Sequence, residues 1–140
     1  MHSSSFIVGP SEGHQVMRRL GVHEARREVQ RGADAVAAVL GQAGPLFRPS
    51  GTPASTPLIR AAARAAGYAR CVSYDVDSLD YLDPGADAVR ARVLALVRPG
   101  SVVSLHLGHA GTVQALPGLL SGLRSRGLTP VTVTQMFAAR

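Results

Sequence analysis

The chain has 140 residues, 46% of them hydrophobic, which is enough for one domain with its own core and too few to expect two. All 15 basic residues are arginine and nine residues are acidic, so the formal net charge of +6 favours anionic partners. The single cysteine, Cys71, excludes an internal disulfide and a multi-cysteine metal site. No apolar run is long enough to span a membrane, and the first residues lack the pattern of a signal peptide, which leaves the cellular location open.

The arginines are scattered over segments that we expect to form exposed helix faces. No basic cluster stands beside an aromatic strand or a recognition helix, as a nucleic-acid interface would require. We therefore expect solvated surfaces and no nucleic-acid partner.

The first half of the chain alternates short apolar segments with a helical pattern. Residues 6–8 predict a strand. Hydrophobic residues recur at helical spacing over residues 22–40, and Gly41 is placed to end that helix. Residues 45–47 predict a strand tip that runs into an irregular loop, after which Thr56 is placed to cap a second helix.

The second half repeats this alternation. Residues 70–74 predict a strand that ends in an acidic run, and Asp83 is placed to cap the following helix. Residues 101–105 predict a buried strand that ends at His106. We then expect a helix over residues 112–126 and a last strand over residues 130–134.

Strands separated by one helix each indicate right-handed βαβ crossovers and a parallel sheet. The loops that follow parallel strands lie at one end of the sheet, where α/β proteins keep their chemistry. The sequence therefore predicts that one rim carries Arg48, Asp77, Asp80 and His106.

A histidine, a carboxylate and an arginine on one rim can form an acid catalyst. A carboxylate bonded to one imidazole nitrogen fixes the tautomer, so that the other nitrogen can donate a proton to a leaving group. The arginine would orient a second carboxylate. On residue types alone, the alternative is that Arg48 and the aspartates only cap helices and close loops.

Three short motifs follow one another at βα spacing. Phe47-Arg-Pro-Ser-Gly51 is similar to an Arg-Pro-Pro-x-Gly loop shortened by one residue. Val76-Asp-Ser-Leu-Asp-Tyr81 is similar to Asp-x-x-Asp-Trp with tyrosine in place of tryptophan, and Ser104-Leu-His106 is similar to a Leu-x-His or Leu-His-Asp strand end. Over residues 47–134 the chain thereby resembles the polysaccharide deacetylase family, the NodB-homology domains of carbohydrate esterase family 4.

The resemblance implies an α/β fold, a deformed (β/α) barrel with a parallel sheet. The chain would supply about four to five βα units, the carboxyl-terminal portion of a single domain over residues 1–140 that lacks its amino-terminal strands and first motif. The implied activity is metal-assisted hydrolysis that removes acetyl groups from an amino-sugar polymer. The implied partner is an acetylated polysaccharide or cell-wall glycan, and the implied cofactor is a divalent metal, usually zinc.

The same resemblance assigns roles to individual residues. His106 would be the acid, Asp77 the carboxylate that increases its basicity, and Arg48 the residue that orients the catalytic base. Substrate-binding positions would be Tyr81, Asp80, Ser50 and Gly51.

Departures from the family pattern affect the base and the metal. The Thr-Phe-Asp-Asp-Gly strand end is absent, since no aspartate precedes Asp34. The His-Ser/Thr-x-x-His motif fits either residues 10–14, which keeps His14 as a metal ligand, or residues 2–6, which keeps His2. Under either reading one histidine remains, whereas catalytic zinc takes three protein ligands. His109 could chelate with His106, but no third ligand is evident.

We therefore expect the chain to be a weak or inactive deacetylase. The alternative is a non-catalytic carbohydrate-binding remnant of the same fold. An in-frame Asp-Asp strand end encoded upstream of Met1 would instead indicate an enzyme with a different start.

Overall fold

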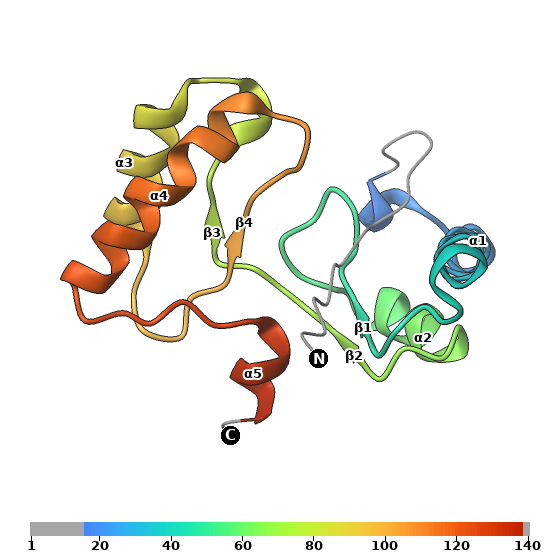
Figure 1. The fold of residues 1–140 in the computed structure, drawn as a ribbon. Coiled ribbons are helices and arrows are strands. Elements are labelled where there is room, and N and C mark those ends of the chain that lie inside the picture. Colours follow the sequence, from blue (N-terminus) through green and yellow to red (C-terminus); the bar gives the residue numbers. More distant parts are fainter. Residues whose placement is uncertain (1–15, 139–140) are drawn as a thin grey trace. The chain divides into compact units, whose positions relative to one another are not determined.

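The computed structural model describes residues 16–138. The chain divides into two compact units, Met1–Ser73 and Tyr74–Arg140, which are described separately (Figure 1). The strand expected at residues 6–8 and the candidate ligands His2 and His14 lie outside the described residues.

The first unit holds two helices and one pair of parallel strands. Its elements are η1 (Met17–Arg19), α1 (Val22–Leu40), β1 (Leu46–Phe47), α2 (Pro57–Ala65) and β2 (Arg70–Cys71). Strand β1 pairs with β2, with Leu46 opposite Arg70. Gly41 ends α1 with φ 80°, a left-handed conformation that glycine adopts without steric strain. At the start of α2, the Thr56 hydroxyl accepts a hydrogen bond from the Ile59 amide at 3.2 Å.

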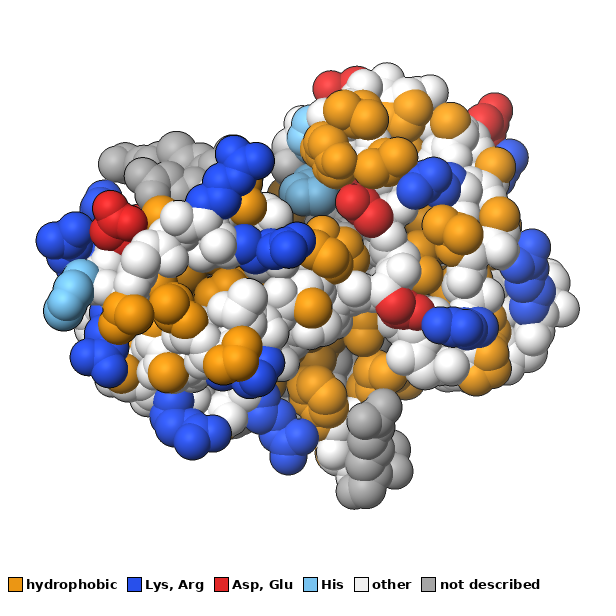
Figure 2. All heavy atoms as spheres, turned by 180° about the vertical axis from the view of Figure 1, so that it is seen from behind, with side chains coloured by type: hydrophobic (Ala, Val, Ile, Leu, Met, Phe, Trp, Pro, Cys, Tyr) orange, Lys and Arg blue, Asp and Glu red, His pale blue; other side chains and the backbone are white. Residues whose placement is uncertain are grey.

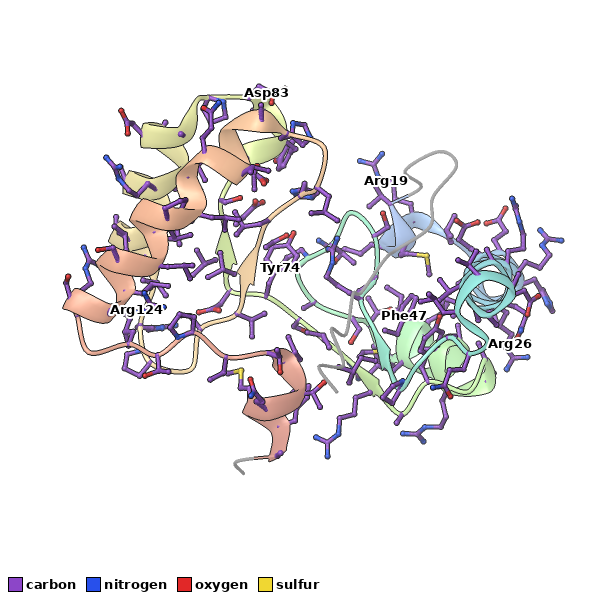
Figure 3. All side chains as sticks on the ribbon, viewed as in Figure 1. Arg19, Arg26, Phe47, Tyr74, Asp83 and Arg124 are labelled. Carbon is purple, nitrogen blue, oxygen red and sulfur yellow. The ribbon has the colours of Figure 1, made fainter. Side chains whose placement is uncertain are left out.

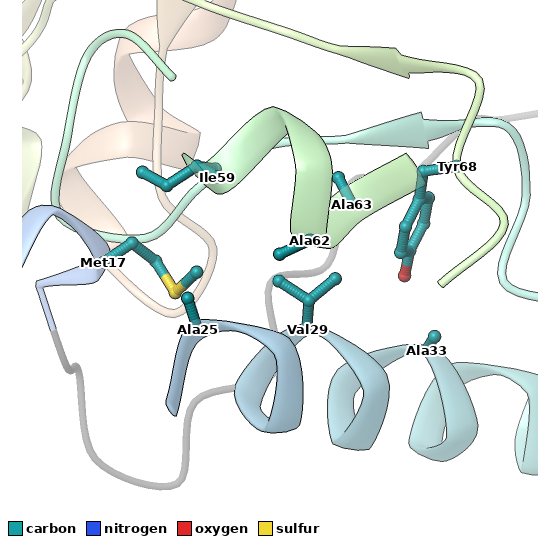
Figure 4. Packing of buried hydrophobic residues seen from close by; sticks show 8 residues of the cluster. All are labelled: Met17, Ala25, Val29, Ala33, Ile59, Ala62, Ala63 and Tyr68. Carbon is teal, nitrogen blue, oxygen red and sulfur yellow. The ribbon is translucent and has the colours of Figure 1, made fainter. Parts of the chain in front are cut away.

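The core of the first unit lies between α1 and α2 (Figure 4). Small residues alternate with Val29 and Ile59 along the facing helices, which lets the two backbones approach closely. The ring of Tyr68 closes one end of this core and lies 5.2 Å from the ring of Phe47. The buried cluster comprises Met17, Ala25, Val29, Ala33, Ile59, Ala62, Ala63 and Tyr68.

The second unit contains one βαβ element followed by two further helices. Its elements are β3 (Val76–Asp77), η2 (Asp80–Leu82), α3 (Ala86–Leu96), β4 (Val103–Ser104), α4 (Ala110–Ser125) and α5 (Val133–Ala138). Strands β3 and β4 are parallel, with Val76 opposite Val103, and α3 lies between them in the chain. The core joins Val76 to Val93 of α3 and to Leu119 and Leu123 of α4.

The α/β class and the parallel strand pairing confirm the coarse prediction, while the arrangement of strands differs from it. The described strands form two separate two-stranded sheets, and they do not close a barrel. The strand expected over residues 70–74 stops at Cys71, and a new strand begins at Val76. Between them, the Asp75 carboxylate accepts hydrogen bonds from the Val102 amide and the Ser101 hydroxyl. The Asp75 amide also donates to the Val102 carbonyl at 3.2 Å, so side-chain and backbone contacts together hold this segment.

Two other predicted boundaries are wrong. Helix α3 begins after Gly85, so Asp83 does not cap it. The last segment forms α5 and not a strand, because the Thr132 hydroxyl accepts a hydrogen bond from the Gln135 amide and starts a helix. In addition, Pro130 has no N–H to give to a strand ladder.

The surface agrees with the expected solvated arginines. Within residues 16–138 every arginine except Arg48 is exposed, and Figure 2 shows basic side chains spread over the face in view. Among these residues, no helix combines the length and apolar character needed to cross a bilayer.

Candidate functional site

Asp80 and His106 meet where β3 and β4 end. Because the two strands are parallel and paired, the loops after them leave the same edge of the sheet. The Asp80 Oδ1 atom lies 2.7 Å from His106 Nδ1. Its Oδ2 atom accepts hydrogen bonds from the His106 amide at 2.6 Å and from the Thr112 hydroxyl at 2.7 Å. The Asp80 side chain is fully buried, whereas the His106 side chain remains 31% exposed.

The turn that carries Asp80 is shaped by its neighbours. Asp77 Oδ1 accepts a hydrogen bond from the Leu79 amide at 3.1 Å, and Ser78 Oγ accepts one from the Asp80 amide at 3.3 Å. Such side-chain contacts two residues along the chain are typical of Asx and Ser turns. Leu79 and Asp83 bracket η2 with left-handed φ angles of 56° and 51°.

The resemblance assigned the carboxylate beside His106 to Asp77. In the structure, the carboxylate in contact with His106 is that of Asp80. The Asp77 carboxylate is engaged in the turn that precedes η2. The three-residue step from Asp77 to Asp80 places only the second carboxylate beneath the end of β4.

Asp80 is ionised at neutral pH. Burial alone would raise the pKa of this carboxyl group, but hydrogen bonds from the His106 amide, the Thr112 hydroxyl, the His106 ring and Ser78 lower it to about 2. An ionised carboxylate only accepts hydrogen bonds, so His106 Nδ1 must carry the shared proton. The remaining ring nitrogen, Nε2, is then available to a ligand.

Tyr81 borders His106 on the exposed side of this site. The two rings are 5.4 Å apart and meet edge to face at 76°. Exposed hydrophobic side chains adjoin the pair in sequence, at Leu82 and Leu107. Figure 2 shows hydrophobic and histidine side chains together on this unit. Such a surface suits a ligand with both polar and apolar faces.

A second histidine–carboxylate pair was not predicted. His109 Nδ1 lies 2.7 Å from Asp83 Oδ1, and its ring centroid lies 6.4 Å from that of His106. Asp83 lies at the end of the unit where α4 begins (Figure 3). Each pair joins residues 26 positions apart in the chain. That repeated spacing is the signal from which the second pair could have been found.

The other predicted site residues belong to the first unit. Arg48 Nη1 donates a hydrogen bond to the Pro49 carbonyl at 3.5 Å. The Ser50 carbonyl accepts a hydrogen bond from the Met17 amide, and Gly51 adopts φ 64° against the side chain of Val16. These contacts define the loop itself, and the expected place of Arg48, Ser50 and Gly51 beside His106 stays a prediction.

The described residues do not fit the zinc that the resemblance implies. Within residues 16–138, no group of three or more histidine, cysteine, aspartate or glutamate side chains is arranged to hold a metal ion. No step of the chemistry is therefore assigned to a metal here.

Comparison with known sequences connects the chain to deacetylases. None of the known protein-family models matches it. A chitooligosaccharide deacetylase of Bradyrhizobium sp. (strain ANU 289) is 30% identical in an alignment 140 positions long that covers 84% of this chain and 64% of the relative. A chitooligosaccharide deacetylase of Rhizobium leguminosarum bv. phaseoli is 36% identical in an alignment 90 positions long that covers 54% of this chain and 38% of the relative.

Comparison with solved structures gives the same family. A family 4 carbohydrate esterase from Streptomyces lividans, solved with acetate, is 28% identical with a TM-score of 0.74 over 88% of this chain and 62% of its own. A T48 deacetylase solved with substrate is 30% identical with a TM-score of 0.75 over 90% of this chain and 61% of its own. The pseudoenzyme BA3943 of Bacillus anthracis, 22% identical with a TM-score of 0.77 over 89% of this chain and 43% of its own, shares the fold. The chain spans less than two thirds of the length of each of these relatives, and over that part it is similar to carbohydrate esterase family 4, the polysaccharide deacetylases.

Proposed function

We propose that the chain supplies the proton-donating half of a polysaccharide deacetylase site, which acts on an acetylated amino-sugar polymer. The observation that carries this proposal is the buried, ionised Asp80 carboxylate that holds His106 Nδ1 and leaves Nε2 available. Relatives described as chitooligosaccharide deacetylases support the substrate class.

The proposed role of His106 is that of a general acid. When the tetrahedral adduct of the acetamide collapses, the carbon–nitrogen bond breaks and the nitrogen must gain a proton to leave as an amine. The protonated His106 ring gives that proton from Nε2, and the acyl group departs as acetate. Asp80 keeps the ring in one orientation, because its oxygen remains bonded to Nδ1 throughout.

We propose that this chain by itself turns over substrate weakly or not at all. The family's strand end with two aspartates, which carries the base, is not found in the sequence. The described residues also include no three-ligand cluster for a metal. The second candidate function is carbohydrate binding without turnover, and the exposed ring of Tyr81 beside His106 favours it as a surface for a sugar face.

Binding and turnover of a chitin tetramer separate these statements. We expect calorimetry to detect binding by the purified chain, and we expect His106→Ala and Tyr81→Ala to weaken it. A matched control is His23→Ala, because His23 is exposed at the start of α1 in the other unit. We expect little or no acetate release with added zinc. The absence of any binding would contradict the proposed function.

Two further outcomes test turnover. Rapid acetate release that His106→Ala abolishes would contradict weak turnover while supporting the role of His106. Binding that is unchanged by a chelator, with no acetate release, would support the carbohydrate-binding function.

A further inference from the structure

The two histidine–carboxylate pairs have the same spacing along the chain. Asp80 and Asp83 are three residues apart at η2, and His106 and His109 are three residues apart after β4. Asp80 opens η2, and Asp83 follows η2 in a left-handed conformation. Each of the two carboxylates contacts the Nδ1 atom of one histidine at 2.7 Å.

Both histidines are held through the same ring nitrogen, Nδ1, while their ring planes lie at 80° to each other. This contact leaves the Nε2 atom of each ring outside the pair. The side chains of His106 and His109 keep exposures of 31% and 27%, so both rings reach the surface. Their centroids are 6.4 Å apart, a spacing comparable with the length of one sugar ring.

Stability alone does not account for the second pair. The Asp83 side chain is 68% exposed, and exposed ion pairs contribute little to folding. Asp83 also adopts a left-handed backbone conformation, which is unfavourable for a residue other than glycine. Gly85, two residues later, has φ 92°, so the segment uses glycine at one position with positive φ and aspartate at the other.

We propose that His109 is a second glycan-contacting residue, whose Nε2 atom bonds a hydroxyl group of the sugar next to the one held at His106. This inference rests on the proposed function. Tyr81 and His109 are both in ring contact with His106, so a row of three rings borders the surface that the polymer would cross. The pair of Asp83 and His109 then sets the preference for a polymer over a single sugar.

Two substitutions distinguish substrate contact from a structural tether. An asparagine amide reaches about as far as Nδ1 of histidine, so His109→Asn keeps the bond to Asp83 and loses the Nε2 group. A glutamine amide reaches about as far as Nε2, so His109→Gln keeps the ligand contact and loses the tether. If His109 has a purely structural role, His109→Asn should weaken tetramer binding less than His109→Gln does. If His109 contacts the substrate, His109→Gln should weaken tetramer binding less than His109→Asn does.

The experiment measures dissociation constants of the full chain for N-acetylglucosamine and for its β-1,4-linked tetramer by NMR titration. We expect His109→Asn to weaken tetramer binding about fivefold, the effect of one lost hydrogen bond, and to leave the monosaccharide constant unchanged. We expect His109→Gln to retain most tetramer affinity. His23→Gln serves as the control, and thermal unfolding of each variant reports the structural effect.

The outcomes keep the two proposals apart. Tetramer binding that is weakened by Tyr81→Ala but unchanged by His109→Asn overturns the inference about His109 alone. Equal weakening of monosaccharide and tetramer by His109→Asn overturns it as well. A native chain that binds neither ligand overturns the proposed function and this inference together.

Discussion

Replacement of Asp80 by asparagine tests the link between burial, charge and the His106 tautomer. The Asp80 pKa of about 2 lies nearly two units below its ordinary value of 3.8. At about 1.4 kcal/mol per unit, ionised Asp80 contributes about 2 to 3 kcal/mol to the stability of the second unit at pH 7. The side chain is fully buried, so solvent screening does not reduce this figure appreciably.

The sign of the pH dependence follows from the lowered pKa. Since the unfolded chain binds the proton more tightly than the folded one, the contribution is complete above about pH 4 and is lost as the pH falls toward 2. Roughly half of it remains at pH 3. We therefore expect Asp80→Asn to destabilise the unit by about 2 to 3 kcal/mol at pH 7 and by about half as much at pH 3.

Asparagine also changes the ring in a defined way. Asp80 Oδ2 accepts from the His106 amide, so the asparagine oxygen must take that position and its NH₂ group must face His106 Nδ1. The ring then has to accept at Nδ1 and carry its proton on Nε2. Nitrogen-15 NMR of the imidazole should report this change of tautomer.

The assay is a urea titration followed by NMR signals of the second unit, which is compact and has its own core. Asp87→Asn is the matched control, since the Asp87 side chain is 89% exposed and should change stability by less than about 0.5 kcal/mol. A loss for Asp80→Asn below about 0.5 kcal/mol at pH 7, or a loss that does not shrink at pH 3, would refute the reasoning.

Two further predictions concern helix packing and capping, and thermal unfolding measures both. In α4, an added Cβ at Gly118 would meet the Arg90 side chain, which is 44% exposed and can move aside, so Gly118→Ala should stabilise by about 0.5 to 1 kcal/mol. The same change at Gly122 would bring Cβ within 2.6 Å of the Leu94 side chain, which packs against the core. Gly122→Ala should therefore destabilise the second unit by about 1 kcal/mol or more. Equal effects on stability at the two positions would contradict this account. Thr56→Ala should destabilise the first unit by about 1 kcal/mol because the α2 cap is lost, whereas Thr56→Ser should retain it.

Elements with strong local signals were predictable from the sequence. The helix over residues 22–40 has the predicted bounds because its hydrophobic spacing and Gly41 act in the same direction. The Thr56 cap is equally local. The last segment was misread because a short run of threonine and valine also suits a strand, and one hydroxyl contact from Thr132 decided for a helix.

The site was predictable in its location and not in its partners. That His106 follows a buried strand is clear from the sequence, as is the acidic run after the preceding strand. Whether Asp77 or Asp80 contacts His106 depends on the length of the turn between β3 and η2. The left-handed conformation of Leu79 sets that length. The pair of His109 and Asp83 depends on the same turn, so it could not be read from residue types alone.

The two left-handed residues that bracket η2 carry a consequence for variation of this chain. Each is destabilising by about 1 to 3 kcal/mol, and the bonds to Asp80 oppose that strain. Glycine at position 79 or 83 would relax the backbone, yet it would free the segment that sets the spacing between the histidines. Selection for thermal stability and selection for ligand recognition would therefore act in opposite directions on these two positions.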